Sequence, residues 1–323
     1  MASRRVIGVD MGGTKLLAGA VDEDLEVHQR AQRVLTGLDQ SAIIETAVEA
    51  VRELRESADA EIAAVGFGIP SLIDRRTGTA VVAVNLALAD IPFCDVMAEQ
   101  LDLPVFVDND ANVAALAEHR AGAARGAQEV VLMTIGTGIG GGLILGGRLY
   151  RGALGAGAEL GHMVIEMDGP RCQGNCPNRG CVEALASGTA LAREATRLAR
   201  EHPGSGLGLA LADGRELAGP LVTELAHDGD PAAIEALRLI GSRLGVAIAS
   251  YVNIFNPEVV VIGGGVIAAG ELLLGPARDQ VAARALPPSR DAVRIVAARF
   301  GVEAGMVGAA ALALDGLGEQ DGD

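Results

Sequence analysis

The sequence contains no tryptophan, and aromatic residues make up only 2% of its 323 residues. Because half of the residues are nevertheless apolar, the core must consist mainly of Ala, Val, Leu and Ile. Such residues suit strands and helices alike. The length exceeds the size at which a single hydrophobic core usually stops growing, so we expect two domains.

Basic residues are also scarce. The chain has 26 Lys and Arg against 42 Asp and Glu, which gives a formal net charge of -16. A protein of this charge repels a phosphate backbone, so a nucleic-acid partner is not expected. The excess of acidic residues also favours solubility.

Long hydrophobic runs are missing as well. The N-terminal apolar run is interrupted at Asp10 and by the glycines after it, which is too early for a signal peptide. The longest uncharged stretch, residues 130–147, contains seven glycines and is expected to form a hairpin rather than a membrane span. We therefore expect a cytoplasmic protein without a membrane partner, in which clustered cysteines indicate a metal site rather than disulfides.

A strand-turn-strand pattern occurs twice. Residues 6–10 and 16–21 are short apolar runs that flank a glycine-rich turn, which predicts two strands. The same pattern recurs about 125 residues downstream, at residues 130–145, as expected if two halves share one architecture.

Helical patterns alternate with further short strands. Residues 41–58 and 231–255 have apolar residues at helical spacing, and Ser41 is the expected cap of the first of these helices. A strand predicted near residues 105–107 leads into an alanine-rich helix at 111–120. This alternation predicts an α/β fold with mixed sheets.

Three glycine-rich turns follow predicted strands. Glycine has no Cβ, so backbone N–H groups in such turns can approach phosphate oxygens. The turns comprise Gly12, Gly13 and Thr14; Gly136, Thr137 and Gly138; and Gly263, Gly264 and Gly265. Asp10 and Lys15 flank the first turn and supply a partner for Mg²⁺ and a cation. One such turn usually means only a tight hairpin, but three in one α/β chain favour a nucleotide, although the spacing matches neither a Walker loop nor a dinucleotide fingerprint.

One histidine and three cysteines lie within twenty residues. They are His162, Cys172, Cys176 and Cys181. Three thiolates and one imidazole form a tetrahedral set that favours Zn²⁺ and leaves no open position for a catalytic water. We therefore expect a structural zinc ion, with incidental or redox-active thiols as the alternative.

Two glutamates flank this cluster. Glu159 lies three residues before His162, and Glu183 lies two residues after Cys181. A bound metal would fix both carboxylates in space, and carboxylates accept strong hydrogen bonds from sugar hydroxyls. Either glutamate alone would be interpreted as a solvated surface residue. Their positions on both sides of the cluster instead predict a pocket for a polyol.

A polar cluster at residues 108–112 lies between a predicted strand and a predicted helix. Ligands of α/β sheets bind beyond the carboxyl ends of the strands, so Asn109 and Asp110 are candidate site residues. The competing interpretation is structural, because Asn109 or either of the neighbouring acids could cap the helix.

These features together resemble the ROK family, which contains bacterial sugar kinases, repressors and related proteins. The resemblance covers nearly the whole chain. It rests on residues 10–15, 68–70, 109–112, 136–142 and 159–162, the cysteine cluster with Glu183, residues 263–265, 304–305 and 308–310. The His and Cys signature together with Asn-Asp-Ala-Asn is highly specific.

The resemblance implies an actin-like, hexokinase-type ATPase fold, in which two ribonuclease-H-like α/β domains lie around a cleft. We expect a smaller domain at residues 1–118, completed by a C-terminal helix at about 303–318, and a larger domain at residues 119–302.

The same resemblance implies an ATP-dependent hexose kinase, with glucose as the expected substrate and glucose 6-phosphate as the product. Asp110 is then the general base that accepts the proton of the sugar hydroxyl. The sugar is held by Asn85, Asn109, Asp110, Glu159, His162 and Glu183. ATP and Mg²⁺ bind at the glycine turns, a structural Zn²⁺ organises the sugar pocket, and the protein forms a homodimer or homotetramer.

Departures from the family pattern bear on the choice of sugar. Two extra residues separate Cys172 from Cys176, and Ala158 and Ser71 stand where the family has glycines beside the pocket. The segment after Asn85 also lacks the usual tryptophan. Kinases for another hexose or for N-acetylmannosamine are therefore alternatives, as are phosphate donors such as polyphosphate.

A non-catalytic sugar-binding regulator is an alternative of a different class. In such proteins a DNA-binding helix-turn-helix domain precedes the first phosphate turn, whereas here Asp10 comes too early for one. The acidic composition also disfavours DNA, so we expect an enzyme.

Overall fold

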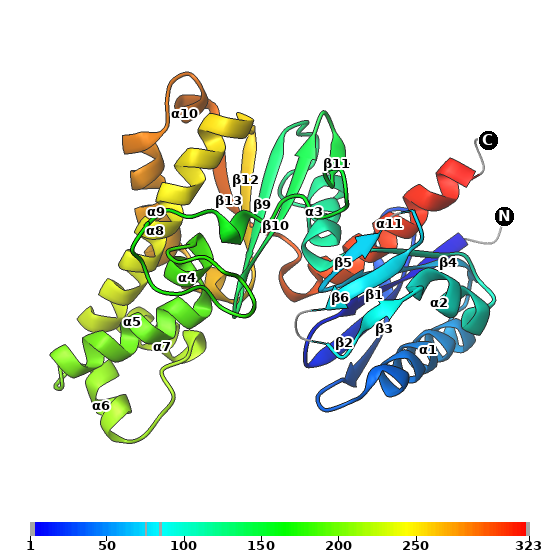
Figure 1. Ribbon diagram of the computed structural model, residues 1–323, viewed down its shortest axis with the longest axis horizontal. Coiled ribbons are helices and arrows are strands. Elements are labelled where there is room, and N and C mark those ends of the chain that lie inside the picture. Colours follow the sequence, from blue (N-terminus) through cyan, green and yellow to red (C-terminus); the bar gives the residue numbers. More distant parts are fainter. Residues whose placement is uncertain (1–3, 75, 84–85, 321–323) are drawn as a thin grey trace. The chain divides into compact units, whose positions relative to one another are not determined.

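Figure 1 shows the computed structural model, which describes residues 4–74, 76–83 and 86–320. The chain divides into two compact units. Unit 1 comprises Met1–Gly126, Gly142–Ala158 and Val302–Asp323, and unit 2 comprises Ala127–Gly141 and Glu159–Gly301. The expected domain boundaries after residues 118 and 302 stay predictions, because compactness alone does not show which parts of a chain fold or move as one.

Unit 1 is built on a five-stranded sheet of order β3-β2-β1-β4-β8 and a small sheet of order β5-β6-β7. In the larger sheet, β1 is antiparallel to β2 and parallel to β4, and β4 is parallel to β8. The strands are β1 (Arg4–Met11), β2 (Lys15–Val21), β3 (Val27–Val34), β4 (Glu61–Ile69), β5 (Ser71–Asp74), β6 (Thr79–Ala83), β7 (Ala89–Ile91) and β8 (Val105–Asn109). The helices are α1 (Gln40–Ser57), α2 (Phe93–Leu101), α3 (Asp110–Arg120) and α11 (Ala304–Gln320), and the 3-10 turn η3 (Gly301–Glu303) leads into α11.

The second five-stranded sheet has the order β11-β10-β9-β12-β13. Its strands are β9 (Val130–Ile135), β10 (Ile139–Leu145), β11 (Arg148–Tyr150), β12 (Val259–Gly263) and β13 (Arg294–Ala297). β12 is parallel to β9 and β13, and β10 is antiparallel to β11. The two large sheets share one strand order. In each, three strands that are consecutive in the chain lie side by side, and two later strands are added next to the first of them. The mixed α/β class and the shared architecture of the two halves are therefore confirmed.

The remaining helices belong to unit 2. They are η1 (Leu160–His162), α4 (Val182–Ala186), α5 (Gly188–Glu201), α6 (Gly206–Ala212), α7 (Gly219–His227), α8 (Pro231–Phe255), η2 (Gly265–Ala269), α9 (Glu271–Arg284) and α10 (Ser289–Ala292). The predicted long helix α8 is confirmed. It is capped by Asp230, which accepts from the Ala233 amide at 3.1 Å, and it ends at Asn256 in the left-handed region, with φ 47°.

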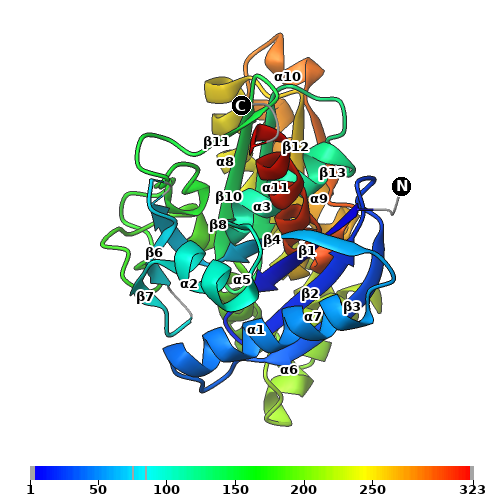
Figure 2. The same cartoon turned by 90° about the vertical axis from the view of Figure 1, so that its right-hand side faces the viewer.

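Three glycines form a row across the large sheet of unit 1. Gly8 on β1 is paired with Gly19 on β2 and with Gly66 on β4. Helix α11 packs on this row, and a Cβ at Gly8 would lie 2.0 Å from the carbonyl oxygen of Met306. At Gly66 a Cβ would lie 1.8 Å from the carbonyl oxygen of Ala309. Only glycine allows a helix to approach a sheet this closely. Figure 2 shows α11, in red, beside α3, which it contacts.

The stretch Gly301–Glu319 is long and apolar enough to cross a membrane by length and composition. Half of it is buried inside the protein, and α11 contacts β1, β4 and α3. Burial against the sheet therefore accounts for its apolar character.

The opposite face of the same sheet carries the core that α1 covers. Alternate residues of a strand point to opposite faces, so Ile7 and Val9 lie on the side away from α11. They are fully buried and belong to one core cluster with Phe67 of β4 and with Ile43 and Val51 of α1.

The cap of α1 differs from the prediction. Asp39, not Ser41, caps this helix, and its side chain accepts from the Ala42 amide at 2.9 Å. Asp39 has the extended backbone of an N-cap, with φ −81° and ψ 175°, whereas Ser41 already lies within the helix.

Candidate functional site

The parallel strands of unit 1 end at one edge of the sheet. Asp10 at the end of β1 is paired with Gly68 on β4, and Gly68 is paired with Asp108 on β8. The candidate base Asp110 follows directly on β8. Ligands of α/β sheets bind at such carboxyl edges, so the structure brings Asp10 and Asp110 to the place where a site is expected.

The charge of Asp110 acts on Asp10 at this edge. Burial and the negative charge of Asp110 raise the pKa of Asp10 to about 7, and Lys15 acts in the opposite direction. Burial also raises the pKa of Asp110. A Cβ on Gly305, at the start of α11, would lie 2.4 Å from the Asp10 carboxyl carbon. This glycine therefore leaves the space that the Asp10 side chain fills.

The structure decides which residue caps α3. The side-chain oxygen of Asn109 accepts from the amides of Ala111 at 2.9 Å and Asn112 at 3.3 Å. Asp110 is the first helical residue, and its Oδ1 also accepts from the Ala111 amide, at 2.9 Å. Asn109 is thus the cap, while the half-buried Asp110 is the first residue of the helix.

An ion pair below this edge was not predicted. Asp108 is buried and Arg151 is partly buried, and the two form a salt bridge between β8 and the segment after β11. Asp108 also accepts from the Asn112 side chain and from the Asn109 amide, both at 2.8 Å. The pair therefore holds the strand that carries Asn109. The sequence contains only a weak signal for it, since Arg151 lies among small residues and 43 positions from its partner.

The first glycine turn lies between β1 and β2. The Gly12 amide donates to the Lys15 carbonyl at 2.9 Å, and the Thr14 carbonyl accepts from the Leu35 amide at 2.9 Å. Thr14 and Lys15 are exposed. Lys15 is also the only lysine in the sequence. The turn is thus fixed by backbone hydrogen bonds, one of them from the segment after β3, and it presents one cation to solvent.

The second and third glycine turns lie side by side in unit 2. They follow β9 and β12, which are parallel, with Gly263 paired to Thr134. Gly264 has φ +84°, and a Cβ there would lie 2.5 Å from the Ile135 amide nitrogen. The predicted turns at Gly136–Gly138 and Gly263–Gly265 therefore share one edge of the second sheet.

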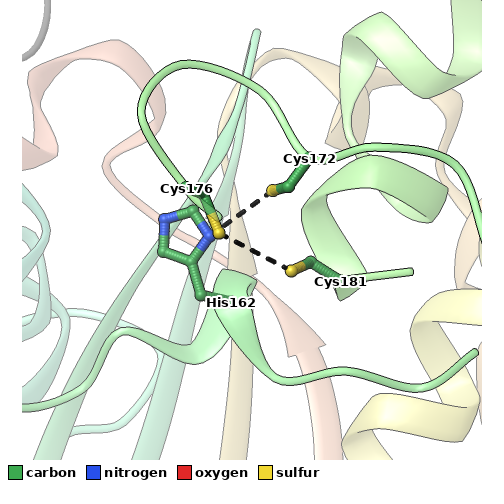
Figure 3. Close-up of side chains that lie close together, drawn as sticks. All are labelled: His162, Cys172, Cys176 and Cys181. Atoms are coloured by element: carbon green, nitrogen blue, oxygen red, sulfur yellow. Dashed lines mark hydrogen bonds between the residues drawn. The ribbon is translucent and has the colours of Figure 1, made fainter. Parts of the chain in front are cut away.

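The predicted metal ligands come together (Figure 3). One donor atom each from His162, Cys172, Cys176 and Cys181 lies within 4.8 Å of the others. The sulfurs of Cys176 and Cys181 are 3.9 Å apart, and the Cys172 sulfur is 3.6 Å from Nδ1 of His162. Tetrahedral zinc with Zn–S of about 2.3 Å and Zn–N of about 2.0 Å requires separations of about 3.8 and 3.6 Å. The donor set fits zinc despite the longer Cys172–Cys176 spacing.

The two glutamates differ in their surroundings. Glu183 is buried; its Oε2 accepts from the Ile139 amide at 2.8 Å, and its Oε1 lies 3.6 Å from the Cys172 sulfur. Glu159 is exposed, and its Oε2 lies 3.9 Å from Nε2 of His162. One ring nitrogen of His162 thus faces the cysteines and the other faces Glu159. The predicted sugar ligand Asn85 lies outside the described residues.

The chain is similar over nearly its whole length to known proteins. The chain is 37% identical over 321 residues to a glucokinase of Thermotoga maritima, covering 98% of this chain and 100% of the relative. A putative xylose repressor of Caldicellulosiruptor is 30% identical, covering 97% of this chain and 78% of the relative. The crystal structure of a ROK family glucokinase from Streptomyces griseus with glucose and AMPPNP is similar, with TM-score 0.85, 36% identity and coverage of 96% and 99%.

The sequence profile of the ROK family matches residues 6–316. This match spans the glycine turns, the Asn109-Asp110 edge and the cysteine cluster. Together with the near-complete overlap with relatives above 35% identity, it shows that the chain belongs to the ROK family.

Proposed function

We propose that this protein is an ATP-dependent glucokinase that converts glucose to glucose 6-phosphate. Relatives named glucokinase are 36–37% identical over nearly the whole chain, and one similar structure contains glucose and AMPPNP. Within the chain itself, the observation that carries the proposal is Asp110. It is a half-buried carboxyl with a raised pKa at the carboxyl edge of a sheet, next to Asp10.

Asp110 acts as the general base. Phosphoryl transfer passes through a loose transition state, so the enzyme contributes mainly positioning and charge stabilisation. As the sugar oxygen attacks the γ-phosphorus, the bond from this phosphorus to the β–γ bridging oxygen breaks and ADP leaves. The proton of the sugar hydroxyl moves to the Asp110 carboxylate. A raised pKa makes this carboxylate a stronger proton acceptor. A regulator that only binds sugar needs no such group, and therefore the kinase is preferred over the regulator.

The remaining predicted residues bind the two substrates. ATP binds to the Lys15 ammonium and to the backbone of the turns at Gly12–Thr14, Gly136–Gly138 and Gly263–Gly265. Asp10 would be the protein partner of the Mg²⁺ that accompanies ATP, and this ion would supply neutralisation of phosphate charge. The sugar hydroxyls bind to the side chains of Asn85, Asn109, Glu159, His162 and Glu183.

Zinc is structural in this proposal. The four donors His162, Cys172, Cys176 and Cys181 fill a tetrahedral shell, so no position is left for a reacting water. Bound zinc would fix the His162 ring through Nδ1 and would hold the segment that carries Glu183. These residues would then present their oxygen and nitrogen atoms to the sugar in one arrangement.

A substrate panel tests the proposed activity. Purified protein is assayed with ATP, Mg²⁺ and either glucose, mannose, fructose or N-acetylmannosamine, by coupling ADP formation to NADH oxidation. We expect the highest kcat/KM with glucose, and a second assay with glucose-6-phosphate dehydrogenase should detect the product. A higher kcat/KM with N-acetylmannosamine, or activity only with polyphosphate, would replace this proposal by one of the two alternatives.

The resemblance also leads us to propose a cytoplasmic homodimer or homotetramer. Light scattering at several protein concentrations measures the mass directly, since one chain has 32.8 kDa. A mass that stays at one chain would contradict the oligomer.

A further inference from the structure

The second glycine turn, Gly136–Gly138, depends on its neighbours for its shape. It has one small side chain, that of Thr137, and its internal hydrogen bond runs from the Gly136 amide to the Gly138 carbonyl, at 3.0 Å. The carbonyls of Gly136 and Thr137 accept hydrogen bonds from residues outside the turn. Gly136 accepts from the Gly188 amide at 2.8 Å, and Thr137 accepts from the Thr189 hydroxyl at 2.9 Å. Both donors belong to the start of α5.

Gln173 is a second donor to the same turn. Its Nε2 donates to the Thr137 carbonyl at 3.2 Å and to the Ser187 hydroxyl at 3.1 Å. Ser187 caps α5 and accepts from the Ala190 amide at 3.2 Å. Both amide hydrogens of Gln173 therefore have acceptors, which fixes the orientation of its side chain. Gln173 thus joins the turn to the helix start that supports it.

Gln173 also lies between two metal ligands. Cys172 precedes it directly and Cys176 follows three positions later, and the Cys176 amide donates to the Gln173 carbonyl at 3.3 Å. A metal held by both thiolates would fix this short segment at its two ends. The segment needs such support, because Gly174 has a left-handed φ of 56° and is exposed. The longer cysteine spacing thus contains the residue that reaches the turn.

We propose that Gln173 is a positioning residue that couples zinc binding at the cysteine cluster to nucleotide binding at the second glycine turn. This inference rests on the proposed role of Gly136–Gly138 in binding ATP. Zinc orders the segment between Cys172 and Cys176, Gln173 then holds the Thr137 carbonyl, and the turn keeps the shape that receives phosphate.

Coupling of this kind is reciprocal. If zinc increases the affinity for nucleotide by a given factor, nucleotide must increase the affinity for zinc by the same factor. Couplings between sites in proteins are commonly about 5- to 150-fold. We expect a value near the lower end, about 5- to 10-fold, because Gln173 supplies one of two side-chain hydrogen bonds to the Thr137 carbonyl.

Calorimetry on three proteins tests the coupling. Mg²⁺–AMPPNP is titrated into zinc-loaded and zinc-stripped wild type, Gln173→Met and Asn175→Ala. Methionine keeps the length of glutamine but lacks both N–H donors, and Asn175 is an exposed residue of the same segment. Zinc should tighten AMPPNP binding in wild type and Asn175→Ala by the same factor, and by less than twofold in Gln173→Met. Equal affinity with and without zinc in wild type, or full coupling in Gln173→Met, would overturn the proposal.

Steady-state kinetics on zinc-loaded protein keep the test decisive if the stripped protein unfolds. Gln173→Met should raise KM for ATP about 5- to 10-fold while KM for glucose changes less than twofold. A merely structural role would raise both KM values together and would lower the zinc content, which would contradict the inference. Absence of glucokinase activity in wild type would instead refute the proposed function, and calorimetry would still measure the coupling.

Discussion

Asp10 and Asp110 show how one sheet edge gives two carboxyls different surroundings. Burial raises the pKa of both, but Lys15 acts only on Asp10, and Asp110 accepts an amide hydrogen bond at the start of α3. Asp110 is thus held in place for its proposed role as the proton acceptor. Asp10 lies beside the only lysine of the chain, where positive charge from Mg²⁺ or Lys15 favours its ionised form.

Asp110→Asn tests the base. An amide cannot accept the hydroxyl proton, so we expect kcat to fall by roughly 10²- to 10⁴-fold while glucose affinity stays nearly unchanged. Steady-state kinetics and glucose calorimetry measure the two effects. Asp95→Asn, at an exposed acid of α2, is the matched control and should behave as wild type. Full activity of Asp110→Asn would disprove the assignment.

Asp10 should make stability depend on pH. Its pKa rises from 3.8 to about 7 on folding, so between these values the folded protein binds a proton that the unfolded chain has released. This bound proton stabilises the folded protein, so it increases the free energy of unfolding. The increase is fully present below about pH 4 and is lost as the pH rises through about 7. Urea unfolding at several pH values should therefore show a steeper decline in wild type than in Asp10→Asn. Parallel curves would contradict the raised pKa.

Lys15 permits a labelling test of the first turn. Since the sequence has no other lysine, an amine-reactive ester modifies only Lys15 and the N-terminal amine. Mg²⁺–AMPPNP at ten times its Kd should slow Lys15 labelling by about elevenfold, as expected for simple occupancy. Peptide mass spectrometry reads both sites, and the N-terminal amine is the internal control. Undiminished labelling of Lys15 would exclude its contact with phosphate.

At the scale of elements, small residues decide how helices meet sheets and each other. The row Gly19-Gly8-Gly66 lets α11 lie on the first sheet, and in unit 2 Gly241 and Gly245 of α8 allow α9 to approach. A Cβ at Gly241 would lie 2.3 Å from the Leu273 carbonyl oxygen and one at Gly245 2.4 Å from that of Ala277. Backbone atoms cannot move aside as side chains do, so these contacts are intolerant of larger residues.

Gly66→Ala should strongly destabilise unit 1. The added methyl group would overlap the backbone of α11, and overpacking of this kind costs about 1–3 kcal/mol or more. Gly318→Ala is the control, because Gly318 is an exposed residue of the same helix with open space around it. There alanine should raise the free energy of unfolding by about 0.5–1 kcal/mol. Urea unfolding that shows equal stability for both variants would contradict the close packing.

At the scale of the whole molecule, the two large sheets repeat one strand order around different chemistry. The edge in unit 1 carries the carboxyls Asp10 and Asp110, whereas the edge in unit 2 carries two glycine turns. The cysteine cluster belongs to unit 2. Beside it, Glu183 contacts Cys172 and accepts from the amide of Ile139, which follows the second turn, and Gln173 donates to the Thr137 carbonyl within that turn. Metal binding should therefore affect substrate binding without taking part in the reaction.

Zinc removal should reduce glucose affinity more than nucleotide affinity. His162 and Glu183 are proposed sugar ligands. Because His162 belongs to the cluster and Glu183 contacts Cys172, we expect a loss on the order of tenfold or more for glucose. Glucose calorimetry before and after chelation without denaturant measures it. Adding zinc back should restore the affinity. Unchanged glucose binding by zinc-free protein would refute the scaffold role of the metal.

Local patterns determined much of this protein from the sequence alone. Periodicity, turn chemistry or ligand type encodes several features within a few residues each. These are the span of α8, the strand-turn-strand repeat, the glycine turns and the four candidate metal ligands. The polar residues 108–112 could likewise be assigned to a strand end. The sequence could not decide between Asn109 and its neighbours as the cap, because each has a suitable side chain.

Only the tertiary structure decided the pairings between distant residues. The paired residues Arg151 and Asp108 are 43 positions apart in the sequence. Gln173 and Thr137 are 36 positions apart. The glycine row that receives α11 likewise joins three strands to the C-terminal helix. No local pattern marks such partners, because a salt bridge, a hydrogen bond from a side-chain amide or a close backbone approach depends on which segments the chain brings together. The sequence therefore determined which groups are present, and the fold decided which of them act on one another.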